Sequence, residues 1–333
     1  MKKILFVPIL VLLAIFYSLL ALDRIELPVY ISRSEIRKTV AATADSIEQK
    51  YVFPAMGHKL ATALRVNLGK GDLYVMSPRK LENKMNLILT QVSHDKHLRI
   101  HFNPRYARDL QDGGQTLTDS VMLSQDRQHD FYFFPVRQFP GGVGYLRMDM
   151  LVEPLHAGDK LARVFDSLKE SKALIVDLRQ NQGGDPEMVQ QFISRFYAPT
   201  QTVHLNDMYS RLTGDTTRYW TIPNMGGTHF PDQPLYVLIS NRTFSAAEEL
   251  AYDLQALHRA VIVGEASGGG ANAGDNLPVG KRFVIFVPNS RAINPYTKSN
   301  WENTGVRPDF QTNPDHALDA ALQMARTQLK KGS

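Results

Sequence analysis

Apolar residues recur every three or four positions through the first part of the chain, which predicts a small bundle of helices. A first helix is expected to bury one face made of Ile36, Val40, Ala44, Ile47 and Tyr51. A second helix is predicted over residues 58–67. A third should begin with Ser77 as its N-cap and Pro78 at its first helical position.

The spacing changes to strict alternation between residues 98 and 102, which predicts a half-buried strand. This strand closes a helical N-terminal domain that we expect to span residues 34–102. Residues 103–129 are polar and include Gly113 and Gly114. We therefore expect a connecting loop there.

Apolar strands and amphipathic helices alternate from residue 130 onward, which predicts a layered α/β domain over residues 130–312. Its expected elements are a hairpin of strands 131–136 and 143–148 around Gly141 and Gly142, a helix 156–168, a strand 173–178, a helix from Pro186, a strand, helix and strand within 235–265, and a strand 282–287. Residues 200–232 are expected to be irregular, and residues 313–333 to form a C-terminal helix.

The N-terminus has the pattern of an export signal. Met1-Lys2-Lys3 precedes nineteen uncharged residues, Ile4–Leu22. The stretch is long enough to cross a bilayer, and the sequence before Ala21 is a poor cleavage site. Residues 1–22 are thus predicted to be an uncleaved signal-anchor rather than a cleaved signal peptide, followed by a linker over 23–33. The remainder would lie outside the cytoplasm, facing the periplasm or extracellular side, or be secreted if cleavage occurs.

Composition narrows the function. The net charge of +5 over 333 residues comes from scattered Lys and Arg, so nucleic acid is not an expected partner. The absence of Cys excludes disulfides, thiolate metal sites and a cysteine nucleophile. No sequence feature indicates an oligomeric state.

Ser245 is the first candidate for chemistry. It follows an apolar strand and a polar turn and precedes an amphipathic helix, so its hydroxyl lies among unpaired N–H groups at the positive end of a helix dipole. Such groups suit the oxyanion that forms when a carbonyl is attacked. The alternative is that Ser245 only caps this helix, a role that Asn241 or Thr243 could also fill.

Three other segments could complete a site. Gly183 and Gly184 follow the strand ALIVDLR and could present N–H groups to a substrate oxygen, or form an ordinary turn. His94 and His97 are candidate bases; their H-x-x-H spacing is a weak zinc signal. Glu302 could orient an imidazole, or be a plain loop residue.

Six blocks in order resemble the S41 family of serine peptidases, the C-terminal processing proteases and their relatives. They are D-x-H-x-R (95–99), G-Y-L-R-M (144–148), V-D-L-R-x-N-x-G-G (176–184), N-R-x-x-S-A-A-E (241–248), R-A-x-I-V-G-E (259–265) and E-N-x-G-V-x-P-D (302–309). The resemblance implies a catalytic domain with a crotonase/ClpP-like ββα spiral, and it favours Ser245 as the nucleophile.

Two departures place the chain within that family. The region after Ser245 lacks the lysine of the Ser–Lys branch, and Lys281 is too far along the chain. The interval 103–130 is too short for a PDZ domain. The chain is therefore more similar to the branch of tricorn protease and interphotoreceptor retinoid-binding protein, which implies Ser245, His97 and Glu302 as the catalytic set, with His94 as the rival base. Oxyanion donors would come from Gly184, Gly183 and Ala246.

The resulting hypothesis is a membrane-anchored serine endopeptidase that hydrolyses exported proteins or peptides and requires no metal or organic cofactor. A non-catalytic carrier of apolar ligands is the alternative, because retinoid-binding relatives share the fold. The complete serine, histidine and glutamate set argues against it. An acyl-CoA enzyme of the crotonase type is a third possibility, which the export signal disfavours.

Overall fold

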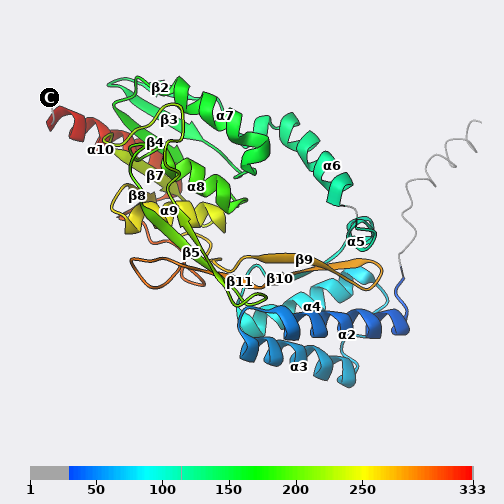
Figure 1. The fold of residues 1–333 in the computed structure, drawn as a ribbon. Helices are drawn as coiled ribbons and strands as arrows, with labels where there is room; N and C mark the ends of the chain where they lie inside the picture. The colour runs from blue at the N-terminus through cyan, green and yellow to red at the C-terminus, as the bar shows by residue number, and fades with distance from the viewer. Residues whose placement is uncertain (1–29, 114, 332–333) are drawn as a thin grey trace, which may run out of the picture.

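The structure is a computed structural model that describes residues 30–113 and 115–331. The predicted signal-anchor at 1–22 and most of the predicted linker lie outside these residues. Within them, no helix has the length and apolarity needed to cross a membrane. The chain forms a helical lobe and an α/β lobe, with α5 (Pro104–Gln111) and α6 (Gln115–Gln128) running from one to the other (Figure 1).

The α/β lobe is built on a six-stranded sheet in the order β12-β8-β7-β4-β3-β2. All neighbours are parallel except β2 and β3. The bounds of the strands are β2 Arg137–Phe139, β3 Val143–Arg147, β4 Ala173–Asp177, β7 Leu235–Ile239, β8 Val261–Gly264 and β12 Phe310–Gln311. Every residue of β4 and β7 is buried, as expected for strands covered on both faces.

Helices cover both faces of this sheet because alternate side chains of each strand point to opposite sides. Leu174 and Val176 pack into the core under α7 (Pro154–Ser167), α8 (Pro186–Ser194) and α9 (Ala246–Ala256). Ala173 and Ile175 face the other way and pack with α10 (Ala317–Lys331), which follows the short helix η2 (Pro314–His316). The predicted α/β class is confirmed.

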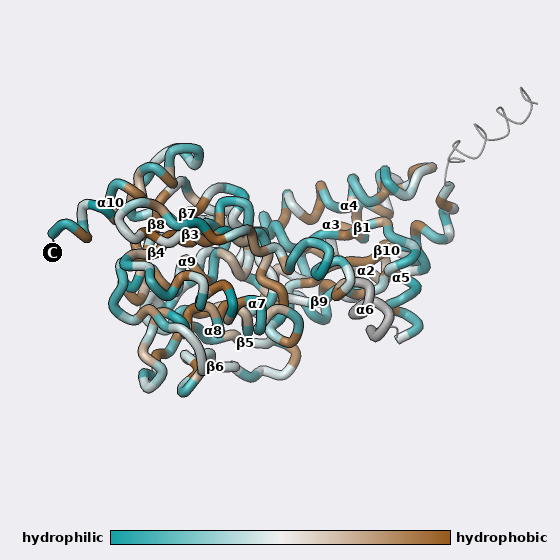
Figure 2. The backbone as a smooth tube through the Cα atoms, turned by 90° about the horizontal axis from the view of Figure 1, so that it is seen from above, coloured by the Kyte–Doolittle hydropathy of each residue, from teal (hydrophilic) through white to brown (hydrophobic). Residues whose placement is uncertain are grey.

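The helical lobe contains the three predicted helices, α2 (Arg33–Lys50), α3 (Pro54–Lys70) and α4 (Pro78–Ser93), followed by β1 (Arg99–Phe102). Their apolar faces are covered by two strands from much later in the chain. β9 (Gly274–Val279) and β10 (Phe283–Pro288) pair with β1 in the order β1-β10-β9. The lobe's core therefore includes residues beyond 34–102. In Figure 2 hydrophobic segments gather inside both lobes.

The prediction of a connecting loop over residues 103–129 is wrong. This segment forms two helices, α5 (Pro104–Gln111) and α6 (Gln115–Gln128). Asn103 caps α5 by accepting the N–H of Tyr106 at 3.0 Å, and Pro104 occupies its first turn. Both segments are mostly polar, so their composition does not separate them from a loop.

Two other expectations need correction. The turn at Gly141 and Gly142 does join two strands, but the first is β2; residues 131–136 instead contain the short helix η1 (Asp130–Tyr132) and one bridge, Phe133 to Met148. The segment 200–232 is not wholly irregular. It contains the strands β5 (His204–Ser210) and β6 (Thr216–Trp220). In a separate antiparallel sheet β5 pairs on one side with β6 and on the other with β11 (Ser290–Ile293).

Candidate active site

Ser245 ends the turn between β7 and α9 with a strained backbone. Its φ of 56° and ψ of −127° are unusual for a residue with a side chain. Two hydrogen bonds of Thr243 fix the turn: its hydroxyl donates to the carbonyl of Leu178 at 2.8 Å and accepts the N–H of Ser240 at 2.9 Å. A serine on a strained strand-to-helix turn is the geometry of a nucleophile elbow.

Gly183 lies directly against this turn. A Cβ at Gly183 would lie 2.7 Å from the Ser245 Cβ and 3.0 Å from the nitrogen of Ala246, and its φ is +106°. Only glycine therefore fits there. Its N–H donates to Asn181 Oδ1 at 2.8 Å, so the expectation that Gly183 is an oxyanion donor is wrong in this conformation.

The other two expected oxyanion donors remain free for a ligand. Gly184 has a φ of +140°, and an added Cβ would collide with the carbonyl of Leu151, with which its segment forms a β-bridge. Ala246 is the first residue of α9, where an N–H has no partner within the helix. In the part of the chain described, no acceptor is recorded for either N–H group.

His97 comes from the helical lobe, between α4 and β1, and packs onto the nucleophile turn. Its ring lies 4.5 Å from that of Phe244, the neighbour of Ser245, and 5.8 Å from that of Phe286 on β10. Burial lowers the pKa of His97, and the negative charge of Asp95 opposes this shift. A neutral imidazole is the form in which histidine acts as a base.

His94 is placed differently. It is exposed and ends α4 in the left-handed conformation, with a φ of 58°, and its N–H donates to the carbonyl of Thr90 at 3.0 Å. Its place is that of a helix C-cap. The structure therefore packs one of the two candidate bases, half-buried, against the turn at Ser245 and leaves the other exposed on the surface.

Glu302 lies in the loop before β12. Its Oε2 accepts the N–H of Ala271 at 2.6 Å, and its Oε1 is buried without a partner. Burial first, and the nearby charge of Asp95 second, raise the pKa of Glu302 to about 7. It lines a cavity of about 330 Å³ with Tyr51, Asp95 and Asn272.

The three expected catalytic side chains are not yet hydrogen-bonded to one another. Within the described residues no hydrogen bond joins Ser245 to His97, and no bond or ion pair joins His97 to Glu302. The Nδ1 of His97 and the Oε1 of Glu302 are both buried and unpartnered. Catalytic hydrogen bonds are often long in free enzymes and tighten when substrate binds.

Glu248, in the first turn of α9, is a residue whose role the sequence did not reveal. Its side chain is buried and accepts four hydrogen bonds, which come from Ser245 N–H at 2.9 Å, Ser267 Oγ at 2.5 Å, Gly269 N–H at 2.6 Å and Gly270 N–H at 2.8 Å. Burial raises the pKa of Glu248, and these hydrogen bonds oppose that shift. The carboxylate thus connects Ser245 to the segment 267–270, against which His97 packs.

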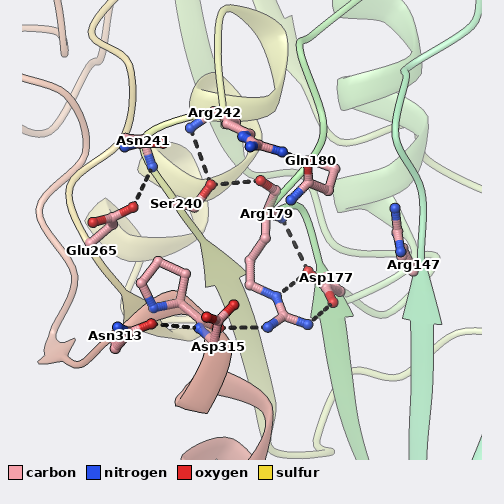
Figure 3. A pocket seen from close by; sticks show the side chains of 11 residues that line it. Arg147, Asp177, Arg179, Gln180, Ser240, Asn241, Arg242, Glu265, Asn313 and Asp315 are labelled. Atoms are coloured by element: carbon pink, nitrogen blue, oxygen red, sulfur yellow. Dashed lines mark hydrogen bonds and ion pairs between the residues drawn. The ribbon is translucent and has the colours of Figure 1, made fainter.

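A polar cavity of about 450 Å³ lies where the loops after β4 and β7 begin (Figure 3). Arg179 spans it, donating to both carboxylate oxygens of Asp177 and to the carbonyl of Pro314. Arg242 donates to Gln180 at 2.7 Å and so links the two loops. The cavity contains none of the three candidate catalytic residues, and its bonds fix the base of the loops that end at Gly184 and Ser245.

Comparison with protein families gives two matches that together span residues 25–312. The model of Peptidase family S41 matches residues 142–312. A second, described as the N-terminal domain of Peptidase_S41 in eukaryotic IRBP, matches residues 25–130. The match to residues 25–130 covers the helical lobe with α5 and α6, and the match to residues 142–312 covers the α/β lobe. The β9–β10 hairpin is the exception, because it belongs to the second match but pairs with β1 of the helical lobe.

Curated relatives are similar over part of their length. The carboxy-terminal processing protease CtpB of Bacillus subtilis (strain 168) is 26% identical over 186 residues, which cover 55% of this chain and 36% of that protein. The carboxyl-terminal-processing protease of Synechocystis sp. is 34% identical over 135 residues, covering 39% and 29%. The chain thus matches about a third of the length of these relatives.

Solved structures share the fold across both lobes. A lipoprotein from Streptococcus agalactiae superposes with a TM-score of 0.60 at 14% identity, covering 91% of this chain and all of that one. The photosystem II D1 C-terminal processing protease gives 0.56 at 15%, covering 89% and 98%. Tricorn protease gives 0.59 at 12%, covering 90% and 37%.

Proposed function

Since the chain belongs to Peptidase family S41, we propose that it is a serine peptidase that cleaves peptide bonds through an acyl-enzyme on Ser245. The observation that carries this proposal is the strained conformation of Ser245 at the start of α9, pressed against Gly183, with the half-buried imidazole of His97 packed on the ring of the neighbouring Phe244. Backbone strain of this kind is concentrated at functional sites.

The proposed chemistry follows the arrangement of donors. Ser245 attacks the scissile carbonyl while His97 takes its proton. The negative oxygen is then stabilised by the N–H groups of Gly184 and Ala246, which have no other recorded acceptor in the described chain. His97 passes its proton to the leaving amine, and water releases the acyl group.

Glu302 is proposed as the acid that orients His97. Its unpartnered Oε1 and the unpartnered Nδ1 of His97 are, in that order, the acceptor and the donor that such a bond requires. A hydrogen bond between them would satisfy two buried polar atoms at once, which favours its formation when substrate closes the site. His94 is not proposed for this role because it is exposed at a helix end.

The proposed setting is outside the cytoplasm. Lys2 and Lys3 and the apolar stretch 4–22 support export and membrane attachment of the chain. The substrates would then be exported proteins or peptides.

The test is labelling of the full chain with a fluorophosphonate probe, which reacts with activated serines. We expect labelling of the wild type, loss of labelling in Ser245→Ala, and wild-type labelling in Ser299→Ala, an exposed serine of another loop. His97→Ala should lower the labelling rate at least 100-fold, the usual contribution of a general base. Equal labelling of wild type and Ser245→Ala would refute the assignment.

A further inference from the structure

Asp95, two residues before His97, is almost fully buried, at 2% exposure, and its carboxylate is saturated with hydrogen bonds. Oδ1 accepts the backbone N–H of His97 at 2.9 Å and of Leu98 at 3.3 Å. Oδ2 accepts the hydroxyl of Tyr51 at 2.9 Å and the side-chain amide of Asn272 at 3.2 Å. A buried charge held in this way is stabilised by its donors rather than by a cation.

The four donors come from three separate parts of the fold. Tyr51 is the residue that ends α2, Asn272 precedes β9, and the two N–H groups belong to the segment that carries His97. The carboxylate therefore fixes the main chain of His97 relative to both the helical bundle and the loop that follows Ser267. His97 has no hydrogen bond of its own from Nδ1 that could do this.

Asp95 also sets the charge around the imidazole. It is the charged group identified as favouring the protonated form of His97, against the effect of burial on its pKa. The other charged or titratable groups on the packed elements are Tyr51 and Lys59 from the helices, Lys96 beside His97, Glu248 on α9 and Glu302. The ammonium of Lys96 donates to the carbonyl of Gly268, in the segment 267–270.

We propose that Asp95 is the positioning residue of the base: it holds the main chain at His97 and stabilises the imidazolium that forms when Ser245 gives up its proton. The proposal rests on the proposed function and adds a second carboxylate to it. Asp95 touches neither substrate nor reacting atoms. In this proposal Glu302 orients the ring through Nδ1, whereas Asp95 acts through the backbone N–H of His97.

The two acids differ in what their loss would do. Asp95→Asn keeps an oxygen that can accept the N–H of His97, so the loop can persist, but it removes the charge. The pKa of His97 then falls, since the group that raised it is gone. A lower pKa means a weaker base, and loss of position adds to the effect, so the maximal rate should fall about 10- to 100-fold.

The experiment measures the rate constant of fluorophosphonate labelling of the full chain between pH 4.5 and 8.5, which requires no known substrate. The wild type should lose reactivity at acid pH as His97 is protonated. In Asp95→Asn this acid limb should move to lower pH while the plateau falls. The control is Asp112→Asn, an exposed acid at the end of α5, which should leave both unchanged.

A lower plateau with an unmoved acid limb would mean that Asp95 is only structural and would overturn the proposal. Tyr51→Phe serves as a second variant if Asp95→Asn does not fold, as judged by thermal unfolding. It keeps the charge but removes one donor that disperses it, so the acid limb should move to higher pH; a limb that stays or falls contradicts the proposal. Labelling that does not depend on Ser245 would instead refute the proposed function, and this inference with it.

Discussion

Gly270 lies where the nucleophile turn, the base and the segment 267–270 meet, and replacing it by alanine tests whether that contact sets the reactivity of Ser245. A Cβ at this position would lie 2.5 Å from Phe244 Cε2 and 2.6 Å from His97 Cε1. Ordinary contacts begin near 3.4 Å, so at least one ring must retreat by nearly 1 Å. The backbone itself accepts alanine, because the φ of Gly270 is not positive.

The magnitude follows from this displacement. A shift of about 1 Å in a catalytic group costs on the order of 100-fold in rate. Crowding a packed site also costs about 1–3 kcal/mol of stability. We therefore expect Gly270→Ala to fold, with a lower unfolding midpoint, and to be labelled by a fluorophosphonate about 100-fold more slowly than the wild type.

Two matched variants separate the causes. Gly268→Ala also presses on Phe244, at 2.6 Å, but no atom of His97 is among its nearest neighbours, so its rate should fall less. Gly226→Ala places its Cβ in open space and should behave as the wild type. Labelling of Gly270→Ala at the wild-type rate would refute the reasoning that His97 acts from its place against Gly270.

Two further predictions concern buried acids of α9. Glu248→Ala leaves three N–H groups and a hydroxyl without their acceptor, so it should lower the free energy of unfolding by about 3 kcal/mol or more; denaturation by urea checks this, and a loss below 1 kcal/mol would contradict it. Burial raises the pKa of Glu249 to about 7 from an ordinary 4.5, so its folded form holds a proton that the unfolded form releases between these values. The stability contributed by this proton is complete below pH 4.5 and lost as pH rises through 7, at most about 3 kcal/mol. Glu249→Gln lacks the proton, so its stability should fall less than that of the wild type between pH 5 and 8, and parallel curves would refute the shift.

The elements that could be predicted from the sequence are those whose pattern is local. The periodic apolar positions of the first helices and the fully apolar strands β4 and β7 were recognisable because each buries a continuous face. Ser245 was recognisable because a strand, a turn and a helix follow one another within one short segment. The helices α5 and α6 were missed because their segments are mostly polar and contain Gly113 and Gly114, a composition that loops share.

Other features depend on contacts between distant parts of the chain. Nothing near Arg282 indicates that β10 pairs with β1 rather than with the main sheet. The hydrogen bond from the Gly183 N–H to Asn181 depends on the conformation of one loop. The sequence of a glycine pair is the same whether its N–H groups are free or hydrogen-bonded. Glu248 and Asp95 stood within quoted motifs, but three of the four donors to Glu248 and two of the four donors to Asp95 come from other segments, so their roles required the three-dimensional structure.

The segment 267–272 explains why both lobes are needed for one site. On one side Glu248 binds it to the start of α9 and hence to Ser245. On the other, Ala271 binds Glu302, and the indole of Trp301 donates to the carbonyl of Gly270 at 2.7 Å.

The following residue, Asn272, donates to Asp95 of the helical lobe, whose carboxylate holds His97. The proposed nucleophile, base and acid are thus fixed relative to one stretch of six residues by buried hydrogen bonds. A change in this stretch should therefore alter the alignment of all three at once, whereas a change at either lobe's periphery should alter stability alone.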